Sequence, residues 1–239
     1  RTAIAPRSGA GIVEGLGVVS WWFVGDRSRR TTHVVALIDV GDGRRALVAR
    51  SLDEPDEPER TLVEAAKDGL AVVLVEPRQQ YEVLAFVPTE DGRALVRFDV
   101  RNGASTIVAR FPDADGRVRN VGVDGGWHVA ILERERPDGS VQLERAVDGR
   151  FETITTWPKD VARASRIVSV RPDGTSAWVV DAGNPLADDT GALYSIDLRD
   201  ARRPWTILAT DDRAELSTML LDPETREPEL VLATWLRNE

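Results

Sequence analysis

The sequence contains no cysteine, and this absence removes several kinds of chemistry at once. Disulfide bonds, thiolate zinc sites and cysteine nucleophiles all need a sulfur atom that this chain does not have. Histidine is nearly as scarce, with two residues in 239. A site that needs several cysteine or histidine side chains is therefore excluded.

Long hydrophobic runs and clustered positive charge are also missing. No apolar stretch approaches the length of a membrane-spanning helix, and the first residues lack the apolar core of a signal peptide. The net charge of −9 argues against a nucleic-acid partner, because phosphate binding depends on clustered Lys and Arg. We expect no membrane, no nucleic acid and a cytoplasmic location. Since residue 1 is not Met, we expect a segment of a longer protein, and a signal peptide lost with the rest stays open.

A unit of short, β-prone strands recurs along the chain. Its strands end in tags that we align at Asp39, Asp99, Ala146 and Asp197. The tags are separated by 60, 47 and 51 residues (99−39, 146−99, 197−146). A period of roughly 40–50 residues with three or four strands is typical of a β-propeller. The sequence therefore predicts an all-β fold of four-stranded antiparallel blades.

We expect residues 1–239 to form one partial propeller domain, with four to five blades cut from a larger ring of seven or eight. The approximate blades are 16–50, 60–111, 117–157, 164–211 and 214–239. The segment 53–59, DEPDEPE, reads as a solvated loop because proline and crowded acids oppose a strand ladder. The residues after it, 60–67, are expected to add one or two helical turns.

Two serines come close to a nucleophile motif. A hydrolase serine sits in G-x-S-x-G on a strand-to-helix turn. Ser105 and Ser176 each have glycine two residues before them, but Ile107 and Trp178 stand where the second glycine is required. Both serines fall in hairpins, so we predict that neither is catalytic.

Metal, base and phosphate motifs are equally weak. His33 and His128 each lie alone in a strand pattern, and a triad or metal site needs partners that converge in space. Asp113–Gly116 resembles the start of a calcium loop, but arginines follow where oxygen ligands are needed. Gly15-Leu16-Gly17 continues into a strand and not a helix. We therefore predict no catalytic, cofactor-binding or metal-binding residues and no cofactor.

Tryptophan is frequent in and beside the expected strands. Large side chains pack propeller blades face to face, so core packing is the first interpretation, and an aromatic binding platform is the alternative. The residues concerned are Trp21, Trp22, Trp127, Trp178, Trp205 and Trp235.

The C-terminal half carries a family resemblance. The segments RPDGTSAWVVDAGNPLADDTGALYSIDL and LLDPETREPELVLATWLRNE resemble the last propeller blades of the prolyl oligopeptidase family of serine peptidases. The closest branch is the bacterial acylaminoacyl-peptidase and dipeptidyl-aminopeptidase type. Asp222–Pro228 resembles a hairpin shortly before the family's hydrolase domain, Arg237–Glu239 resembles its junction, and Asp138–Ile154 resembles an earlier blade.

The resemblance implies a non-catalytic propeller that gates access of short peptides to an α/β-hydrolase domain. In that family the catalytic triad lies in the hydrolase domain, which would follow Glu239, so no triad residue is carried onto this chain. The implied partners are that domain in the same polypeptide and short peptide substrates. Two alternatives stay open: a free-standing propeller that binds protein or glycan, and a small propeller enzyme acting on sugars or lactones.

Overall fold

The computed structural model describes residues 17–25, 30–75, 81–183, 191–200, 202–211 and 214–234. The chain divides into two compact units, Arg1–Phe111 and Pro112–Glu239, and each is considered by itself. All the regular structure described is β-strand, apart from two short 3₁₀ turns at Asp113–Asp115 and Val161–Arg163.

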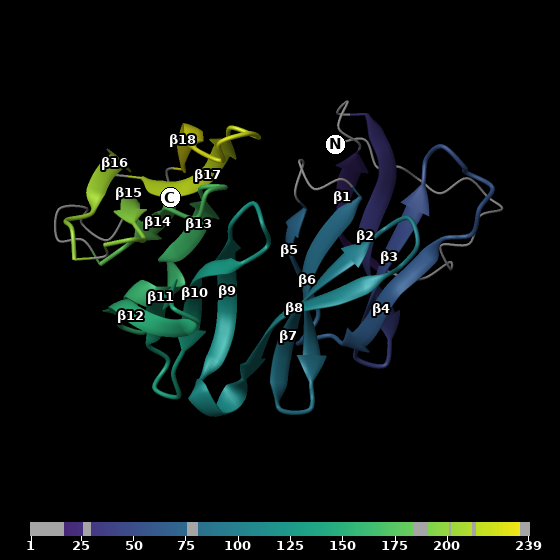
Figure 1. Ribbon diagram of the computed structural model, residues 1–239, viewed down its shortest axis with the longest axis horizontal. Coiled ribbons are helices and arrows are strands. Elements are labelled where there is room, and N and C mark those ends of the chain that lie inside the picture. Colours follow the sequence, from purple (N-terminus) through teal and green to yellow (C-terminus); the bar gives the residue numbers. More distant parts are fainter. Residues whose placement is uncertain are drawn as a thin grey trace, which may run out of the picture. The chain divides into compact units, whose positions relative to one another are not determined.

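The first unit contains two four-stranded antiparallel sheets in which strands follow one another in chain order (Figure 1). The first sheet comprises β1 (Gly17–Gly25), β2 (Thr31–Gly41), β3 (Arg44–Ser51) and β4 (Arg60–Ala66). The second comprises β5 (Ala71–Val75), β6 (Glu82–Thr89), β7 (Gly92–Asp99) and β8 (Ser105–Pro112).

The second unit repeats this plan twice and adds a hairpin. One sheet comprises β9 (Arg117–Val123), β10 (Val129–Glu135), β11 (Val141–Val147) and β12 (Arg150–Trp157). The next comprises β13 (Arg166–Val170), β14 (Ser176–Asp181), β15 (Ala192–Asp197) and β16 (Thr206–Thr210). The hairpin pairs β17 (Glu215–Leu221) with β18 (Pro228–Thr234). All five belong to a simple up-and-down series, which is the blade pattern of a propeller.

Aspartates close many of the turns. In the Pro-Asp-Gly turns, Asp138 and Asp173 accept hydrogen bonds from the backbone N–H groups two residues later, at 2.9 and 3.0 Å. The glycine of each turn, Gly139 or Gly174, has a positive φ of 83° or 72°, which a side chain would make costly. Local chemistry of this kind predicts a turn at each Pro-Asp-Gly sequence.

The core consists of apolar side chains that alternate along the strands and meet between successive sheets. In the first unit, Val35 and Leu47 of the first sheet pack with Val83 and Phe98 of the second. In the second unit, Ile131 and Trp157 pack against the following sheet. Face-to-face burial of this kind is the main source of stability for a repeated sheet.

Two sequence expectations are corrected here. Residues 60–67 do not form helical turns, because Arg60–Ala66 is strand β4 and pairs with β3. Strand β4 is the fourth strand of the first sheet, so this sheet ends at Ala66 and not near residue 50, where the first blade was expected to end. The alignment of Asp39 is also wrong: Asp39 lies near the end of the second strand of its sheet, whereas Asp99 and Asp197 end third strands.

The third strand of the first sheet ends at Ser51, and this is the true counterpart of Asp99. The spacing between them is 48 residues (99−51), so the unusual interval of 60 disappears. The all-β fold of four-stranded antiparallel blades is confirmed. The number of blades in an intact ring stays a prediction.

Candidate interaction surface

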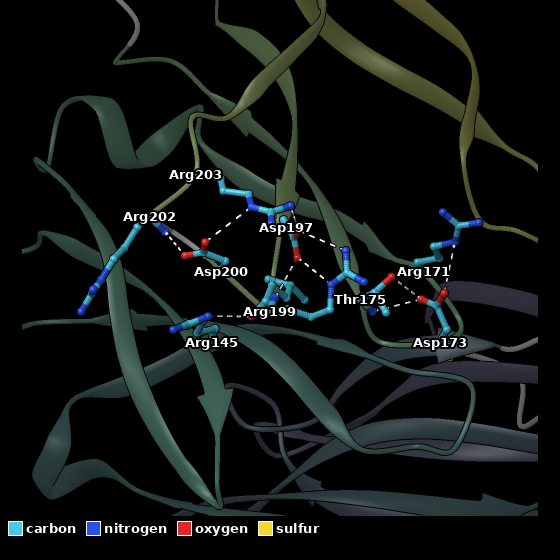
Figure 2. A network of polar contacts seen from close by, with 10 residues as sticks. Arg145, Arg171, Asp173, Thr175, Asp197, Arg199, Asp200, Arg202 and Arg203 are labelled. Atoms are coloured by element: carbon cyan, nitrogen blue, oxygen red, sulfur yellow. Dashed lines mark hydrogen bonds and ion pairs between the residues drawn. The ribbon is translucent and has the colours of Figure 1, made fainter.

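The polar network drawn in Figure 2 lies at one edge of the sheet β13–β16. Ser176 at the start of β14 pairs with Asp197 at the end of β15, so the β13–β14 turn and the β15–β16 loop share this edge. We call this network the arginine edge and define it by Arg145, Arg171, Asp173, Thr175, Asp197, Arg199, Asp200, Arg202 and Arg203.

Asp197 is the centre of the arginine edge. Its Oδ1 atom accepts hydrogen bonds from the backbone N and the Nε of Arg199, both at 3.0 Å, and its Oδ2 accepts one from Nη2 at 3.1 Å. Arg203 donates to the same Oδ2 at 3.2 Å. Hydrogen bonds from Arg199 to the ionised carboxylate lower the pKa of Asp197 to about 2.

The same Asp-x-Arg arrangement occurs in the second sheet. Asp99 accepts from the backbone N and Nε of Arg101 at 2.9 and 3.0 Å, and from Nη2 at 2.5 Å. The apolar residue between the charged pair is buried in both copies, as Val100 and Leu198. Its N–H donates to the first turn of its own sheet, to Tyr81 O in one case and to Thr175 O in the other.

This repeated contact, which we call the clip, joins the end of the third strand to the chain at or next to the start of the second strand. In the first sheet Leu52 N–H donates to Thr32 O at 2.8 Å, although Ser51 stands where the other two sheets have Asp. The backbone bond is thus shared by three sheets, and the Asp–Arg pair reinforces it in two of them. The tags at Asp99 and Asp197 are therefore parts of a structural contact, whereas those at Asp39 and Ala146 are not.

Arg145 joins the arginine edge from the neighbouring sheet of the same unit. Its Nη1 donates to the carbonyl oxygen of Leu198 at 2.8 Å, and its Nη2 pairs with Glu152 at 3.1 Å. Arg171 pairs with Asp173 at 3.5 Å and with Glu227 at 3.7 Å. Because most of these guanidinium groups already have carboxylate partners, the edge is a braced polar surface and not an open anion pocket.

His33 belongs to a second polar cluster, in the first unit. Its ring meets the ring of Tyr81 edge-on, with centroids 5.8 Å apart, and Arg101 lies over Tyr81 at 4.4 Å. Burial lowers the pKa of His33, which favours the neutral imidazole near pH 7. Its Nδ1 contacts Thr32 Oγ1 at 3.0 Å, so His33 is a packed structural residue.

His128 closes the turn between β9 and β10. Asp124 accepts hydrogen bonds from the backbone N of Gly126 and of His128, each at 2.8 Å, and lies 3.1 Å from His128 Nδ1. Trp127 sits buried in this turn with a φ of 68°. The turn holds a buried tryptophan in a strained backbone conformation, and the contacts of His128 given above are to Asp124 of the same turn.

The two candidate serines lie at strand starts. Ser105 begins β8 and is exposed, and Ser176 begins β14, where its carbonyl accepts from Arg171 N–H. Within the described ranges, neither serine side chain hydrogen-bonds to a histidine. Their lack of a catalytic role stays a prediction.

Asp113–Asp115, the start of the segment that resembles a calcium loop, forms a single 3₁₀ turn that Gly116 ends. In the part of the chain that the structure describes, no three His, Asp or Glu side chains gather as metal ligands. The described residues also include no helix long and apolar enough to cross a membrane. Gly15 and Leu16 lie outside the described residues, as do Asn184–Thr190 and Arg237–Glu239 of the resemblance.

The tryptophans divide between core and surface. Trp127 and Trp178 are buried, Trp22 packs on the first core, and Trp205 meets Tyr194 edge-on. Trp21 is 50% exposed, against the expectation of core packing. Trp235 lies outside the described residues.

Sequence reasoning missed the buried charged residues, which among the described residues are Arg93, Glu133, Arg134, Glu144 and Arg226. Glu133 on β10 is 2% exposed, and its Oε1 accepts from Ile167 N on β13 at 2.6 Å and from Asn120 Nδ2 at 3.1 Å. Burial raises the pKa of Glu133. Arg226 is also buried, in the β17–β18 turn. The only signal for Glu133 in the sequence is that it directly follows the apolar run Val129–Leu132 within the same strand.

A curated peptidase is similar to this chain in sequence. The chain is 24% identical over 176 residues to dipeptidyl aminopeptidase BIII of Pseudoxanthomonas mexicana, a match that covers 72% of this chain. This relative is named as a dipeptidyl aminopeptidase, which is one of the two peptidase types that the sequence motifs resemble. The chain has the strand pattern of a β-propeller, and over these 176 residues it is similar in sequence to this peptidase. The match spans 24% of the relative's length.

Solved structures of oligopeptidases also resemble this propeller. Oligopeptidase B from Leishmania major matches with a TM-score of 0.49 and 7% identity, over 86% of this chain and 28% of that one. Prolyl oligopeptidase B from Galerina marginata matches with a TM-score of 0.46 and 14% identity, over 80% and 26%. No protein-family model matches the propeller.

Proposed function

We propose that this propeller is the non-catalytic part of a serine exopeptidase or oligopeptidase, and that it admits short peptides to an α/β-hydrolase domain of the same polypeptide. The similarity to a dipeptidyl aminopeptidase over 176 residues carries this proposal. The nucleophile and its base lie outside these 239 residues. A cytoplasmic location is part of the proposal, because a chain without cysteine suits a reducing compartment.

The physical basis of this gating is that rigid sheets beside a catalytic site exclude bulky substrates. Sheets that are buried face to face, and braced at their edges by clips such as Asp197–Arg199, resist local opening. A wall of such sheets beside a catalytic site admits a flexible peptide and keeps a folded protein out. In this proposal the propeller selects substrates by size, and the hydrolase domain cleaves the peptide bond.

A pair of substrates tests this function. The complete coding sequence that contains these residues is expressed and given a chromogenic dipeptide, and then a folded protein that exposes the same dipeptide at its N-terminus. We expect hydrolysis of the dipeptide and at least tenfold slower release from the folded protein. Equal rates on both substrates would contradict gating, and no hydrolysis of either would contradict the peptidase assignment.

A further inference from the structure

His33 lies at the contact between the two sheets of the first unit. On β2 it alternates with Val35 and Leu37, so these three side chains share one face of the first sheet. Val35 and Leu37 belong to the core that this sheet forms with the second sheet. His33 therefore stands at the end of an apolar row that faces the second sheet, and it is partly buried there.

The second sheet meets His33 with an aromatic ring. Tyr81, which directly precedes β6, lies edge-on to the imidazole with ring centroids 5.8 Å apart, and it packs against the same core. The guanidinium of Arg101 lies over the ring of Tyr81, with Cζ 4.4 Å from the centroid. The aromatic ring that His33 contacts therefore already holds one cation.

The surroundings of His33 favour its neutral form. Burial is the largest influence and lowers the pKa of His33. Among the charged groups, Asp53 and Asp99 raise this pKa, whereas Arg101 and Arg60 lower it. The two carboxylates do not outweigh burial and the two arginines, so the pKa of His33 lies below its usual value.

Each of these two carboxylates already has a guanidinium partner. Asp99 accepts hydrogen bonds from Nε and Nη2 of Arg101 at 3.0 and 2.5 Å, and Asp53 pairs with Arg30. A proton on His33 would therefore add a positive charge to a contact whose negative charges are already paired. Arg101 and the imidazolium would also share one aromatic ring.

We propose that His33 is a pH-sensitive switch at the contact between the first two sheets: it supports the contact as a neutral ring, and acid loosens the contact by charging that ring. The unfolded chain binds this proton with a pKa near 6.5, and the folded chain binds it only at lower pH. The contribution of His33 to folding stability is therefore constant above that value and falls as the pH drops below it. The proposal does not depend on the peptidase function.

A titration of the imidazole groups tests the first half of the proposal. The chain has two histidines, and His128 is the internal reference because its side chain is 82% exposed. Proton NMR follows the Cε1–H signal of each ring between about pH 8 and pH 4, and His128→Gln assigns the two signals. We expect His33 to titrate at a lower pH than His128. Arg101→Gln should move the midpoint of His33 upwards, because it removes a cation and releases the carboxylate of Asp99.

Amide hydrogen exchange tests the second half. Protection factors, which allow for the intrinsic effect of pH on exchange, are measured for β2 and β6 at about pH 7 and about pH 5. We expect protection in the unmodified chain to fall roughly threefold or more on acidification. His33→Gln cannot titrate and should remove most of this fall. The matched control is His128→Gln, which removes the other histidine and should respond to acid as the unmodified chain does.

Two results would each overturn the proposal. His33 could titrate at the same pH as His128 or above it, which would mean that the contact tolerates an imidazolium. This result comes from the unmodified side chain, so it does not depend on whether His33→Gln folds. Alternatively, the protection of β2 and β6 could be unchanged by acid, or could fall equally in the unmodified chain and in His33→Gln, which would assign any acid response to other groups.

Discussion

Arg226 donates a hydrogen bond from Nη1 to the carbonyl oxygen of Val123, 2.5 Å away and 103 residues earlier in the chain. The same Nη1 reaches the carbonyl oxygen of Val170 at 3.3 Å. One buried guanidinium in the β17–β18 turn thus holds the ends of β9 and β13, the first strands of two preceding sheets. It links three successive blades of the second unit.

Arg226→Gln should loosen the last hairpin. A buried hydrogen bond from a charged donor is worth about 1.5–3 kcal/mol, and glutamine is too short to reach both carbonyl groups. We expect amide hydrogens of β17 and β18 to exchange at least tenfold faster, while those of β1–β4 keep their rates. Unchanged exchange in the hairpin would show that Arg226 does not hold it.

Asp197→Asn should lower the melting temperature at neutral pH and lose this effect in acid. The folded pKa of Asp197 is about 2, below its usual value of 3.8, because Arg199 donates to the ionised form. A lowered carboxyl pKa adds stability that is complete above the unfolded pKa and is lost as the pH falls through the folded pKa. The difference between variant and parent should therefore shrink between roughly pH 4 and pH 2.

The matched control for this experiment is Asp56→Asn, in the exposed loop of residues 53–59. It removes one carboxylate without touching a clip. If the melting temperatures of the two variants changed with pH in the same way, the Asp197–Arg199 pair would have no special role in stability.

Two substitutions of Glu133 distinguish the contribution of its hydrogen bonds to stability from the contribution of its charge. Glu133→Leu leaves the buried N–H of Ile167 without its acceptor and should cost about 1–3 kcal/mol in the free energy of unfolding. Glu133→Gln keeps an acceptor oxygen and should cost less. Denaturant unfolding measures both, with Glu90→Leu in an exposed turn as control. Equal losses for the leucine and glutamine variants would contradict this account.

Gly122 allows two strands to approach closely. A Cβ atom added there would lie 2.3 Å from Val170 Cγ2 and 2.7 Å from Ile131 Cγ2. Gly122→Ala should therefore destabilise the second unit by about 1–3 kcal/mol. The added change Val170→Ala should recover part of this loss, which a double-mutant cycle measures. Strictly additive losses would show that the two residues do not compete for space.

The blade pattern could be predicted because its signals are local. Alternating apolar strands and turns such as Pro137-Asp138-Gly139, between β10 and β11, carry their own physical cause, so the repeated blades could be predicted. Strand β4 was missed because RTLVEAA has no clear alternation, and pairing with β3 decides its conformation. The roles of Glu133 and Arg226 depend on partners 34 and 103 residues away, which no local pattern contains.

The central claim, that bond breaking takes place outside these residues, is tested most directly by an active-site label. The purified 239-residue chain is treated with a fluorophosphonate, which reacts covalently with activated serines, and modified peptides are identified by mass spectrometry. The complete coding sequence is treated in parallel. We predict a labelled serine in the complete protein at a position beyond these residues, and none in the 239-residue chain. Labelling of Ser105, Ser176 or any other serine of the folded chain would contradict the account.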